Sequence, residues 1–289
     1  MIKHLCVIGT GLIGGSLALA LKKSGHVAQI TGLGREAEQS LKNLQKAKEL
    51  GVIDHYETSY AKAITPADMV FIAVPIGAMA DVFYQIAPHL RPHAIVTDGA
   101  SSKHTVIDAA IKKLGKKVSQ FVPGHPIAGT EKSGVEAAFP TLYNGRRVVL
   151  TPLEENTQAS IASVRDMWLA AGAKVDEMGA RHHDLVLAAT SHLPHVLAFA
   201  LVDSLNKMDD ADEVFKYAAG GFRDFTRIAS SDAVMWRDIC LNNSEAILAM
   251  MHRYQDELDI LKQAILASDG DQLMEIFSDA KRARDSFCM

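Results

Sequence analysis

Residues 5–15, with the sequence LCVIGTGLIGG, constrain the fold more than any other segment of the chain. An apolar run that predicts a strand leads directly into Gly9, Gly11 and Gly14, and a helix-like pattern follows. Glycines at this spacing are typical of a tight strand-to-helix turn at which backbone approaches a pyrophosphate. The segment therefore predicts a dinucleotide site, with the phosphates at a helix N-terminus. A plain glycine-rich turn is the alternative reading.

The first part of the chain alternates β-rich runs with helix-like stretches. The runs predicted as strands are residues 4–8, 28–33, 69–74, 94–98, 118–122, 147–151 and 174–178. One amphipathic helix, residues 158–171, is predicted between the last two. Because each crossover helix packs back onto the sheet it left, this rhythm predicts an α/β fold with a parallel sheet covered on both faces.

After residue 178 the pattern becomes helical throughout. The predicted helices are residues 180–207, 211–219, 233–267 and 271–286, with Asp232 and Asp271 as N-caps of the last two. We therefore expect two domains, a Rossmann-type dinucleotide-binding domain at 1–178 and an all-α domain at 179–289. The first helix is apolar on most sides from Leu185 to Leu201, so we expect a second copy of the chain to cover it in a homodimer.

Composition narrows the class of protein. Of 289 residues, 48% are hydrophobic and 22% charged, which excludes a disordered or coiled-coil chain. The net charge of −4 is too small and too mixed to favour nucleic acid as a partner. We take residues 69–80 as the longest apolar stretch, too short to span a membrane. With no secretory signal and only Cys6, Cys240 and Cys288, far apart, the chain is expected in the reducing cytoplasm.

The end of the second predicted strand bears on the choice between NAD and NADP. Gly34 stands where an NAD site usually offers a carboxylate to the ribose, and Arg35 follows it. A small residue removes repulsion of a 2′-phosphate and an arginine attracts it, so we expect NADP. The alternative is NAD, with Glu36 on the ribose and Arg35 in solvent. The other expected cofactor-binding residues are Leu12, Ile13, Val74 and Pro75.

Four polar segments lie where loops or helix ends are expected to face a cleft, namely residues 98–103, 124–134, 191–195 and 221–227. The first two follow the carboxyl ends of predicted strands, where ligands bind in open α/β sheets. His125 lies between Gly124 and Pro126, and a neutral imidazole is well suited to accept a proton near pH 7. We therefore expect His125 to be a general base, with a buried structural histidine as the alternative.

His192 and His195 are three residues apart and share a helix face, so we considered a metal site completed by His182 or His183. No glutamate accompanies them as in a zinc protease, and Pro194 disturbs the helix between them, so no metal is expected.

Arg223 and Arg227 are neighbours on a helical turn, and their guanidinium groups suit substrate carboxylates. Surface salt bridges to Asp224 or Asp232 are the alternative.

Five motifs occur in one order along the chain, namely GTGLIGGS at 9–16, DGASSK at 98–103, GHPIAGTEKSG at 124–134, SHLPH at 191–195 and GFRDFTRIASSDAVMWRDI at 221–239. In this combination the chain resembles the prephenate and arogenate dehydrogenases of tyrosine biosynthesis. The resemblance implies a Rossmann domain, a helical dimerisation domain and a substrate cleft between them. It also implies oxidative decarboxylation of prephenate or arogenate with hydride transfer to NAD(P).

The same resemblance implies roles for individual residues. Ser101 and His125 match the pair that contacts the ring hydroxyl, and His195 and Arg227 match substrate-binding residues. The remaining substrate-binding candidates are Thr130, His192 and Arg223. The chain departs from the family pattern at Gly34, where NAD-preferring members have an acidic residue, and at Ser102, which replaces a commonly apolar residue.

Two other classes of function stay open. A related Rossmann-plus-helical hydroxyacid dehydrogenase would use a lysine base on a helix of the second domain, a region poor in lysines that look buried. A non-catalytic nucleotide-sensing module would need the glycine turn but not His125, His195 and Arg227.

Overall fold

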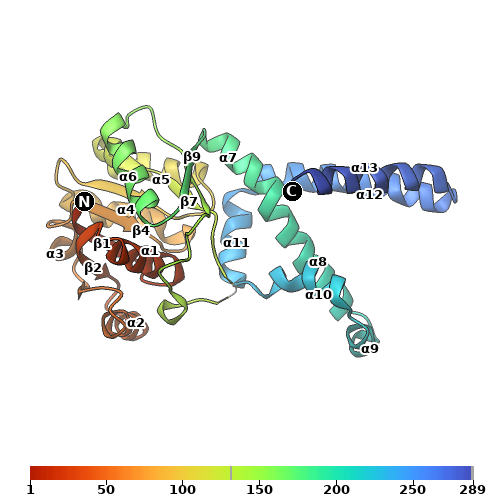
Figure 1. Ribbon diagram of the computed structural model, residues 1–289, viewed down its shortest axis with the longest axis horizontal. Helices are drawn as coiled ribbons and strands as arrows, with labels where there is room; N and C mark the ends of the chain where they lie inside the picture. The colour runs from red at the N-terminus through yellow and green to blue at the C-terminus, as the bar shows by residue number, and fades with distance from the viewer. Residues whose placement is uncertain (131, 288–289) are drawn as a thin grey trace. The chain divides into compact units, whose positions relative to one another are not determined.

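The structure is a computed structural model that describes residues 1–130 and 132–287 (Figure 1). Glu131, within the motif at 124–134, and Cys288 lie outside the described residues. Contacts between residues divide the chain into two compact units, Met1–Ser244 and a second that begins at Glu245. This division does not test the domain border expected after residue 178, which marks a change in the type of element and stays a prediction.

Six parallel strands form the main sheet, in the order β3-β2-β1-β4-β5-β6. They are β1 (Ile2–Ile8), β2 (Val27–Leu33), β3 (His55–Glu57), β4 (Met69–Ile72), β5 (Ile95–Asp98) and β6 (Phe121–Val122). The parallel sheet is thus confirmed. Sequence reasoning missed β3, because three residues with the sequence HYE carry no apolar pattern.

The central strands explain why the sheet needs cover on both faces. In β4, Met69 and Phe71 belong to one buried cluster, whereas Val70 and Ile72 belong to another. Successive side chains of a strand point to opposite faces, so an unbroken apolar run buries both. Trp168 contributes to the first cluster and packs edge-on against Phe71, with ring centroids 5.6 Å apart.

Helices connect the strands of the first unit, and Figure 1 shows them beside the sheet. They are α1 (Leu12–Lys23), α2 (Glu38–Glu49), α3 (Tyr60–Ile64), α4 (Met79–Ile86), α5 (His104–Leu114) and α6 (Gln158–Ala170). The predicted helix at 158–171 is confirmed as α6.

A second sheet follows the first and carries His125. It has the order β7-β8-β9, with β7 (Gly124–Pro126) antiparallel to β8 (Arg147–Leu150) and β8 parallel to β9 (Lys174–Glu177). The strands predicted at 147–151 and 174–178 therefore exist, but they belong to this smaller sheet. Sequence reasoning missed β7 because its three residues include a glycine and a proline.

From Ala180 to Phe287 the regular elements described are all helical. They are α7 (Ala180–Leu187), a π-turn (Ala188–His192), α8 (Leu193–Asn206), α9 (Ala211–Lys216), α10 (Gly220–Thr226), a 3₁₀ turn (Arg227–Ser230), α11 (Ala233–Asn242), α12 (Ser244–Leu266) and α13 (Gly270–Phe287). The expected helix at 180–207 is not one regular helix, because the π-turn interrupts it just before Pro194. The expected helix at 233–267 breaks at Asn243.

One of the two expected N-caps is correct. The Asp232 carboxylate accepts a hydrogen bond from the backbone N–H of Met235 at 2.7 Å and caps α11. The assignment of Asp271 is wrong, because the Asp269 carboxylate accepts the bond from the N–H of Gln272 at 2.9 Å. Asp271 instead lies in the first turn of α13.

The stretch Ala180–Asn206 is long and apolar enough to cross a membrane by length and composition, with 22% of its most apolar window buried. It is longer than residues 69–80, so the prediction that those residues form the longest apolar stretch is wrong. Its polar residues His183, Asp184 and His192 are buried and hydrogen-bonded within the first unit. Because these buried polar groups lie within the stretch, it is not a convincing membrane span, although most of its apolar window is not buried.

Candidate active site

The three glycines of the first turn differ in what surrounds them. Gly9 has a positive φ of +94°, and a Cβ there would clash with the carbonyl oxygen of Ala73. A Cβ on Gly14 would clash with the carbonyl oxygen of Gly9, whereas one on Gly11 would meet nothing within 4 Å. Gly11 is the N-cap of α1 and has no side-chain capping bond. The turn therefore presents open backbone and a helix N-terminus, as a pyrophosphate requires.

The tip of β2 has little space for a larger residue at position 34. A Cβ on Gly34 would lie 2.6 Å from Ser40 Oγ and 2.9 Å from Leu44 Cδ1. Ser40 Oγ in turn accepts a hydrogen bond from the Arg35 backbone N–H at 2.9 Å. The packing thus favours a residue without a side chain, and the side chain of Arg35 is exposed beside it.

The glycine turn and the His125 segment lie close together. Side-chain atoms of Ile13 and Pro126 both lie within 4 Å of the position that a Cβ on Gly99 would occupy. Val74 lies beside Gly9 in the same way. Gly99 follows β5, so the predicted cofactor residues and His125 meet at the carboxyl edge of the main sheet.

His125 is part of a buried chain of hydrogen-bonding side chains. Its Nδ1 lies 2.9 Å from Nε2 of His183, and Nδ1 of His183 lies 2.8 Å from Oδ1 of Asp184. Burial lowers the pKa of His125 well below its usual value, and His183, Lys103 and His192 lower it further. Burial also lowers the pKa of His183, although Asp184 opposes this. Both imidazoles are therefore neutral at pH 7, the form in which one can accept a proton.

Asp184 is held by the N-terminus of α5. Its Oδ1 and Oδ2 accept hydrogen bonds from the backbone N–H groups of Lys103 and His104, each at 2.8 Å. Burial opposes its charge, but the bonds from His183, Lys103 and His104 outweigh it and the pKa of Asp184 is lowered. The carboxylate is therefore ionised and accepts hydrogen bonds only.

Lys103 ties the loop after β5 to the strand that carries His125. Its fully buried Nζ donates to Oδ2 of Asp98 at 2.6 Å and to the carbonyl oxygen of Gly124 at 2.7 Å. Oδ1 of Asp98 accepts the N–H of Gly124 at 3.0 Å. Burial lowers the pKa of Lys103 and Asp98 opposes this. Two of its three N–H donors are used by this network, and Lys103 precedes α5 instead of lying on one of the helices after residue 178, so it does not fit the lysine base of a hydroxyacid dehydrogenase.

A second pair of histidines, His192 and His195, contacts the indole ring of Trp236 in α11. The rings of His195 and Trp236 are stacked with centroids 3.8 Å apart, and His192 meets the same indole edge-on at 6.0 Å. Burial lowers the pKa of His192 to about 4. The indole Nε1 of Trp236 is buried and has no hydrogen-bond partner among the described residues. It is a free donor beside two predicted substrate-binding histidines.

The other predicted site residues are less closely joined to this cluster. Ser101 is partly buried, and no hydrogen bond links it to His125 in the described part of the chain. Thr130 is exposed and pairs with Lys132, whose N–H it accepts at 3.2 Å. Arg223 and Arg227 are exposed, on α10 and the turn after it, which pack against α8. The structure thus brings the histidines together, and the part that these four residues take in the same site stays a prediction.

Sequence reasoning missed several members of the cluster. Asp184 and Asn243 were not considered, and His183 was considered only as a metal ligand. Lys103 and Trp236 lay within motifs without an assigned role. These residues share one feature: each has a polar group that needs a hydrogen-bond partner when it is buried. The spacing of residues in the sequence does not show which of them are buried. The unusual Ser102 is fully buried, and its hydroxyl has no hydrogen-bond partner among the residues described.

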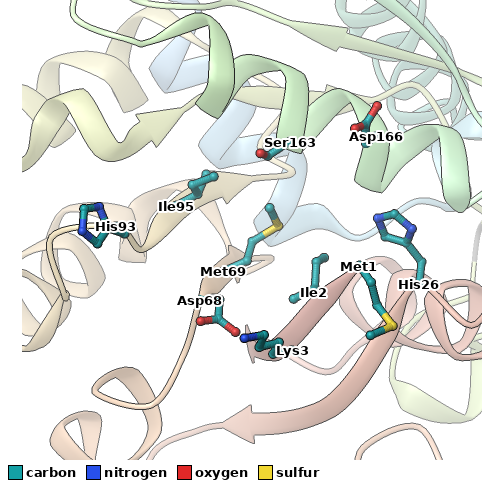
Figure 2. Close-up of a pocket in the computed structure, with 10 residues that line it drawn as sticks. All are labelled: Met1, Ile2, Lys3, His26, Asp68, Met69, His93, Ile95, Ser163 and Asp166. Atoms are coloured by element: carbon teal, nitrogen blue, oxygen red, sulfur yellow. The ribbon is translucent and has the colours of Figure 1, made fainter.

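The first unit also holds a pocket of about 310 Å³. Figure 2 shows the residues that line it. Its lining residues are Met1, Ile2, Lys3, His26, Asp68, Met69, His93, Ile95, Ser163 and Asp166. Ile2, Met69 and Ile95 begin their strands, so the pocket lies at the amino edge of the sheet, opposite the edge at which such sheets bind ligands. Within the described residues, no three His, Cys, Asp or Glu side chains are placed to hold a metal ion.

A Rossmann sheet with an open glycine turn beside a buried neutral histidine defines the class of NAD(P)-dependent oxidoreductases. Family models agree with this class and narrow it. Residues 17–177 match the nucleotide-binding domain of prephenate dehydrogenase, and residues 179–279 match its dimerization domain. The chain belongs to the prephenate dehydrogenase family.

Individual relatives support this assignment. The chain is 36% identical to the cyclohexadienyl dehydrogenase of Zymomonas mobilis, over 98% of this chain and 95% of that one. It is similar to the structure of Aquifex aeolicus prephenate dehydrogenase in complex with hydroxyphenyl propionate and NAD⁺, with a TM-score of 0.91, 37% identity and 99% of each chain covered. Synechocystis arogenate dehydrogenase matches with a TM-score of 0.82 and 28% identity, over 99% of this chain and 100% of that one.

Proposed function

We propose that this protein catalyses the oxidative decarboxylation of prephenate or arogenate with NADP as the hydride acceptor. The observation that carries the proposal is the chain from Asp184 through His183 to His125, at the edge of the sheet where the glycine turn lies. A base next to a nicotinamide is what this reaction requires.

The reaction divides into three bond changes. The bound nicotinamide supplies the acceptor for the hydride that leaves the ring carbon bearing the hydroxyl. His125 takes the proton of that hydroxyl as the oxygen becomes a carbonyl, and the phenolate formed by decarboxylation then regains a proton from the His125 imidazolium to give the phenol of the product. The bond to the ring carboxylate breaks, carbon dioxide leaves, and its electron pair completes the aromatic ring. The lowered pKa of His125 keeps its ring neutral and ready for the proton.

Substrate binding falls to cations and donors around His125. Arg227 is proposed to bind a carboxylate, and His195 to contact the substrate from its place against Trp236. The free Nε1–H of Trp236 adds a donor at the same place, because a buried N–H without an acceptor is satisfied when a ligand oxygen reaches it. Truncation of Arg227 should therefore raise KM more than it lowers kcat.

NADP is proposed over NAD because of the packing around Gly34. A carboxylate at this position would have to displace Ser40 and Leu44. Glu36, the alternative ribose ligand, accepts a hydrogen bond from the Thr58 hydroxyl at 3.4 Å. Arg35 is exposed at the strand tip, where a 2′-phosphate would lie.

A homodimer in the cytoplasm is the proposed assembly and location. Within α8 only Ala198 is buried, and along the apolar stretch Leu185 is 49% and Leu201 36% exposed. A second copy of the chain would cover these residues, as the matched dimerization domain suggests. Light scattering at micromolar concentration tests this, and a monomer that retains full activity would contradict it.

One assay separates this function from its alternatives. The purified protein is offered prephenate, arogenate and a panel of 3-hydroxyacids, each with NADP and with NAD, and reduced nucleotide is followed by absorbance. We expect turnover of a cyclohexadienyl substrate with release of carbon dioxide. Turnover of hydroxyacids alone would indicate a hydroxyacid dehydrogenase, and nucleotide binding without turnover of any substrate would indicate a sensing module.

A further inference from the structure

The contacts of Asp184 determine which nitrogen of His183 carries a proton. An ionised carboxylate only accepts, so Nδ1 of His183, 2.8 Å away, must carry the hydrogen. Because the ring is neutral, its Nε2 then holds a lone pair. Asp184 cannot turn away, because the N–H groups of Lys103 and His104 hold both of its oxygens.

The same reasoning continues to His125. Its Nδ1 lies 2.9 Å from the lone pair on Nε2 of His183 and must donate to it. A neutral imidazole carries one proton, so the lone pair of His125 lies on Nε2, on the other side of the ring from His183. We propose that His183, oriented by Asp184, is a positioning residue that fixes the tautomer of His125 and thereby makes Nε2 its basic atom.

This inference rests on the proposed role of His125 as the base and adds the atom that accepts the proton. A histidine without such a partner populates both tautomers, and only one of them has its lone pair on Nε2. When the tautomer is fixed before the substrate binds, Nε2 of His125 can accept the proton in every enzyme molecule. Partners that orient an imidazole in this way act through ring orientation and basicity without touching the substrate.

His192 provides an internal comparison with the opposite tautomer. Nδ2 of Asn243 lies 2.9 Å from the carbonyl oxygen of Asp184 and 3.1 Å from Nδ1 of His192. A carbonyl oxygen only accepts, so the Asn243 atom is the amide nitrogen, and its second hydrogen points to His192. Nδ1 of His192 therefore accepts, and its proton lies on Nε2. The structure thus assigns different tautomers to two buried histidines near the same aspartate.

Nitrogen NMR of the wild-type protein tests the tautomers directly. The protein is labelled with ¹⁵N-histidine, signals are assigned by loss in the His125→Asn and His192→Asn variants, and spectra are recorded at pH 7.5 without ligands. We expect a protonated Nδ1 in His125 and a protonated Nε2 in His192. A protonated Nε2 or averaged nitrogen shifts in His125 would overturn the proposal. This result does not depend on turnover, so it stands apart from a failure of the proposed function.

Two substitutions of His183 then test the positioning role. His183→Leu removes the acceptor, and we expect kcat to fall by about 10- to 100-fold with little change in KM, together with averaged His125 shifts. His183→Gln places an amide oxygen near the former Nε2, and we expect it to restore most of kcat and the single tautomer. The exposed neighbour variant His182→Gln is the matched control and should behave as wild type.

Equal losses of kcat in the leucine and glutamine variants, or a loss confined to KM, would show that His183 only supports the fold. If the leucine variant does not fold, the glutamine variant still decides. Retention of the wild-type tautomer and kcat supports the proposal, and loss of either overturns it.

Discussion

The glycine turn and the histidine cluster lie at the same edge of the sheet but are built in different ways. The turn uses backbone from one short segment, and its key position, Gly11, is open. The cluster uses side chains from α7, the π-turn, α8, α11 and the second sheet, and most of them are buried. A site made of backbone atoms has no group that titrates near neutral pH. A site made of buried histidines makes both the activity and the folding stability depend on pH. Substitutions in the glycine turn should therefore change nucleotide affinity or folding stability, whereas substitutions in the histidine cluster should change kcat and its pH dependence.

Replacing the base should have the largest effect. His125→Asn keeps approximate size and some hydrogen bonding but cannot take a proton at neutral pH. We expect kcat to fall by about 10²- to 10⁴-fold, with nucleotide affinity unchanged because the glycine turn is intact. Steady-state kinetics and calorimetric titration of the nucleotide measure the two effects.

The pH profile sharpens the same test. The pKa of His125 lies well below its usual value, so kcat/KM of the wild type should stay level down to pH 6.5 and fall only below it. A variant that keeps near-normal kcat, or keeps this acid limb, would show that His125 is structural. His195 would then be the next candidate for the base.

The second-largest expected effect is a loss of folding stability in acid, caused by protonation of the buried histidine cluster. The pKa of His192 is about 4 when folded, against an ordinary value of 6.5. Between these values the unfolded chain binds a proton that the folded chain does not. The contribution of the neutral His192 to the free energy of unfolding is therefore fully present above pH 6.5. It is lost as the pH falls toward 4, and the loss for this residue is about 3 kcal/mol.

Urea unfolding at pH 7.5, 6 and 4.5 measures this loss. The His192→Gln variant is the control, since its stability should fall less over the same range. An identical fall in both proteins would place the acid sensitivity elsewhere, and His183, whose pKa burial also lowers, would be tested next.

The two regions also differ in how far sequence could predict them. The strand–turn–helix of the glycine turn could be predicted because its determinants are local: strand, glycine spacing and helix adjoin one another, and the structure shows the clashes that require Gly9 and Gly14. Its binding of a nucleotide stays a prediction. The parallel sheet could be predicted for a similar reason. An unbroken apolar run such as that of β4 indicates a strand whose side chains are buried on both faces of the sheet. The short strands β3 and β7 were missed because three residues carry no periodicity.

The histidine cluster was predicted only as separate residues. His125 and His195 stand out through their motifs, but the hydrogen bond between His125 and His183 joins residues 58 positions apart, and no sequence pattern shows it. Burial decides which imidazoles are neutral, and burial depends on packing of the helices against the sheet. The roles assigned to the predicted site residues stay predictions, namely those of Ser101, His125, Thr130, His192, His195, Arg223 and Arg227.

Alanine substitutions in the glycine turn separate its folding and binding functions. Gly14→Ala places a Cβ against the carbonyl oxygen of Gly9, so we expect a loss of about 1–3 kcal/mol in the free energy of unfolding. Gly11 has a negative φ of −74° and open space, so Gly11→Ala should fold normally. Its methyl group would instead keep the pyrophosphate away and weaken nucleotide binding by roughly tenfold. Thermal unfolding and calorimetry measure the pair, and equal stability of both variants would contradict the assignment.

The smallest expected effect concerns Arg35, the one side chain assigned to the nucleotide end of the site through its charge. Arg35 is exposed, and exposed ion pairs contribute at most about 1 kcal/mol. We therefore expect Arg35→Ala to weaken NADP binding by up to about fivefold and to leave NAD binding unchanged, because only NADP carries the 2′-phosphate. Titrations at two salt concentrations measure this, with Arg35→Lys as the charge-conserving control. The difference between wild type and Arg35→Ala should shrink at high salt, where exposed charges are screened. A wild-type protein that binds NAD as tightly as NADP, or a variant that loses affinity for both equally, would contradict the placement of the 2′-phosphate beside Arg35.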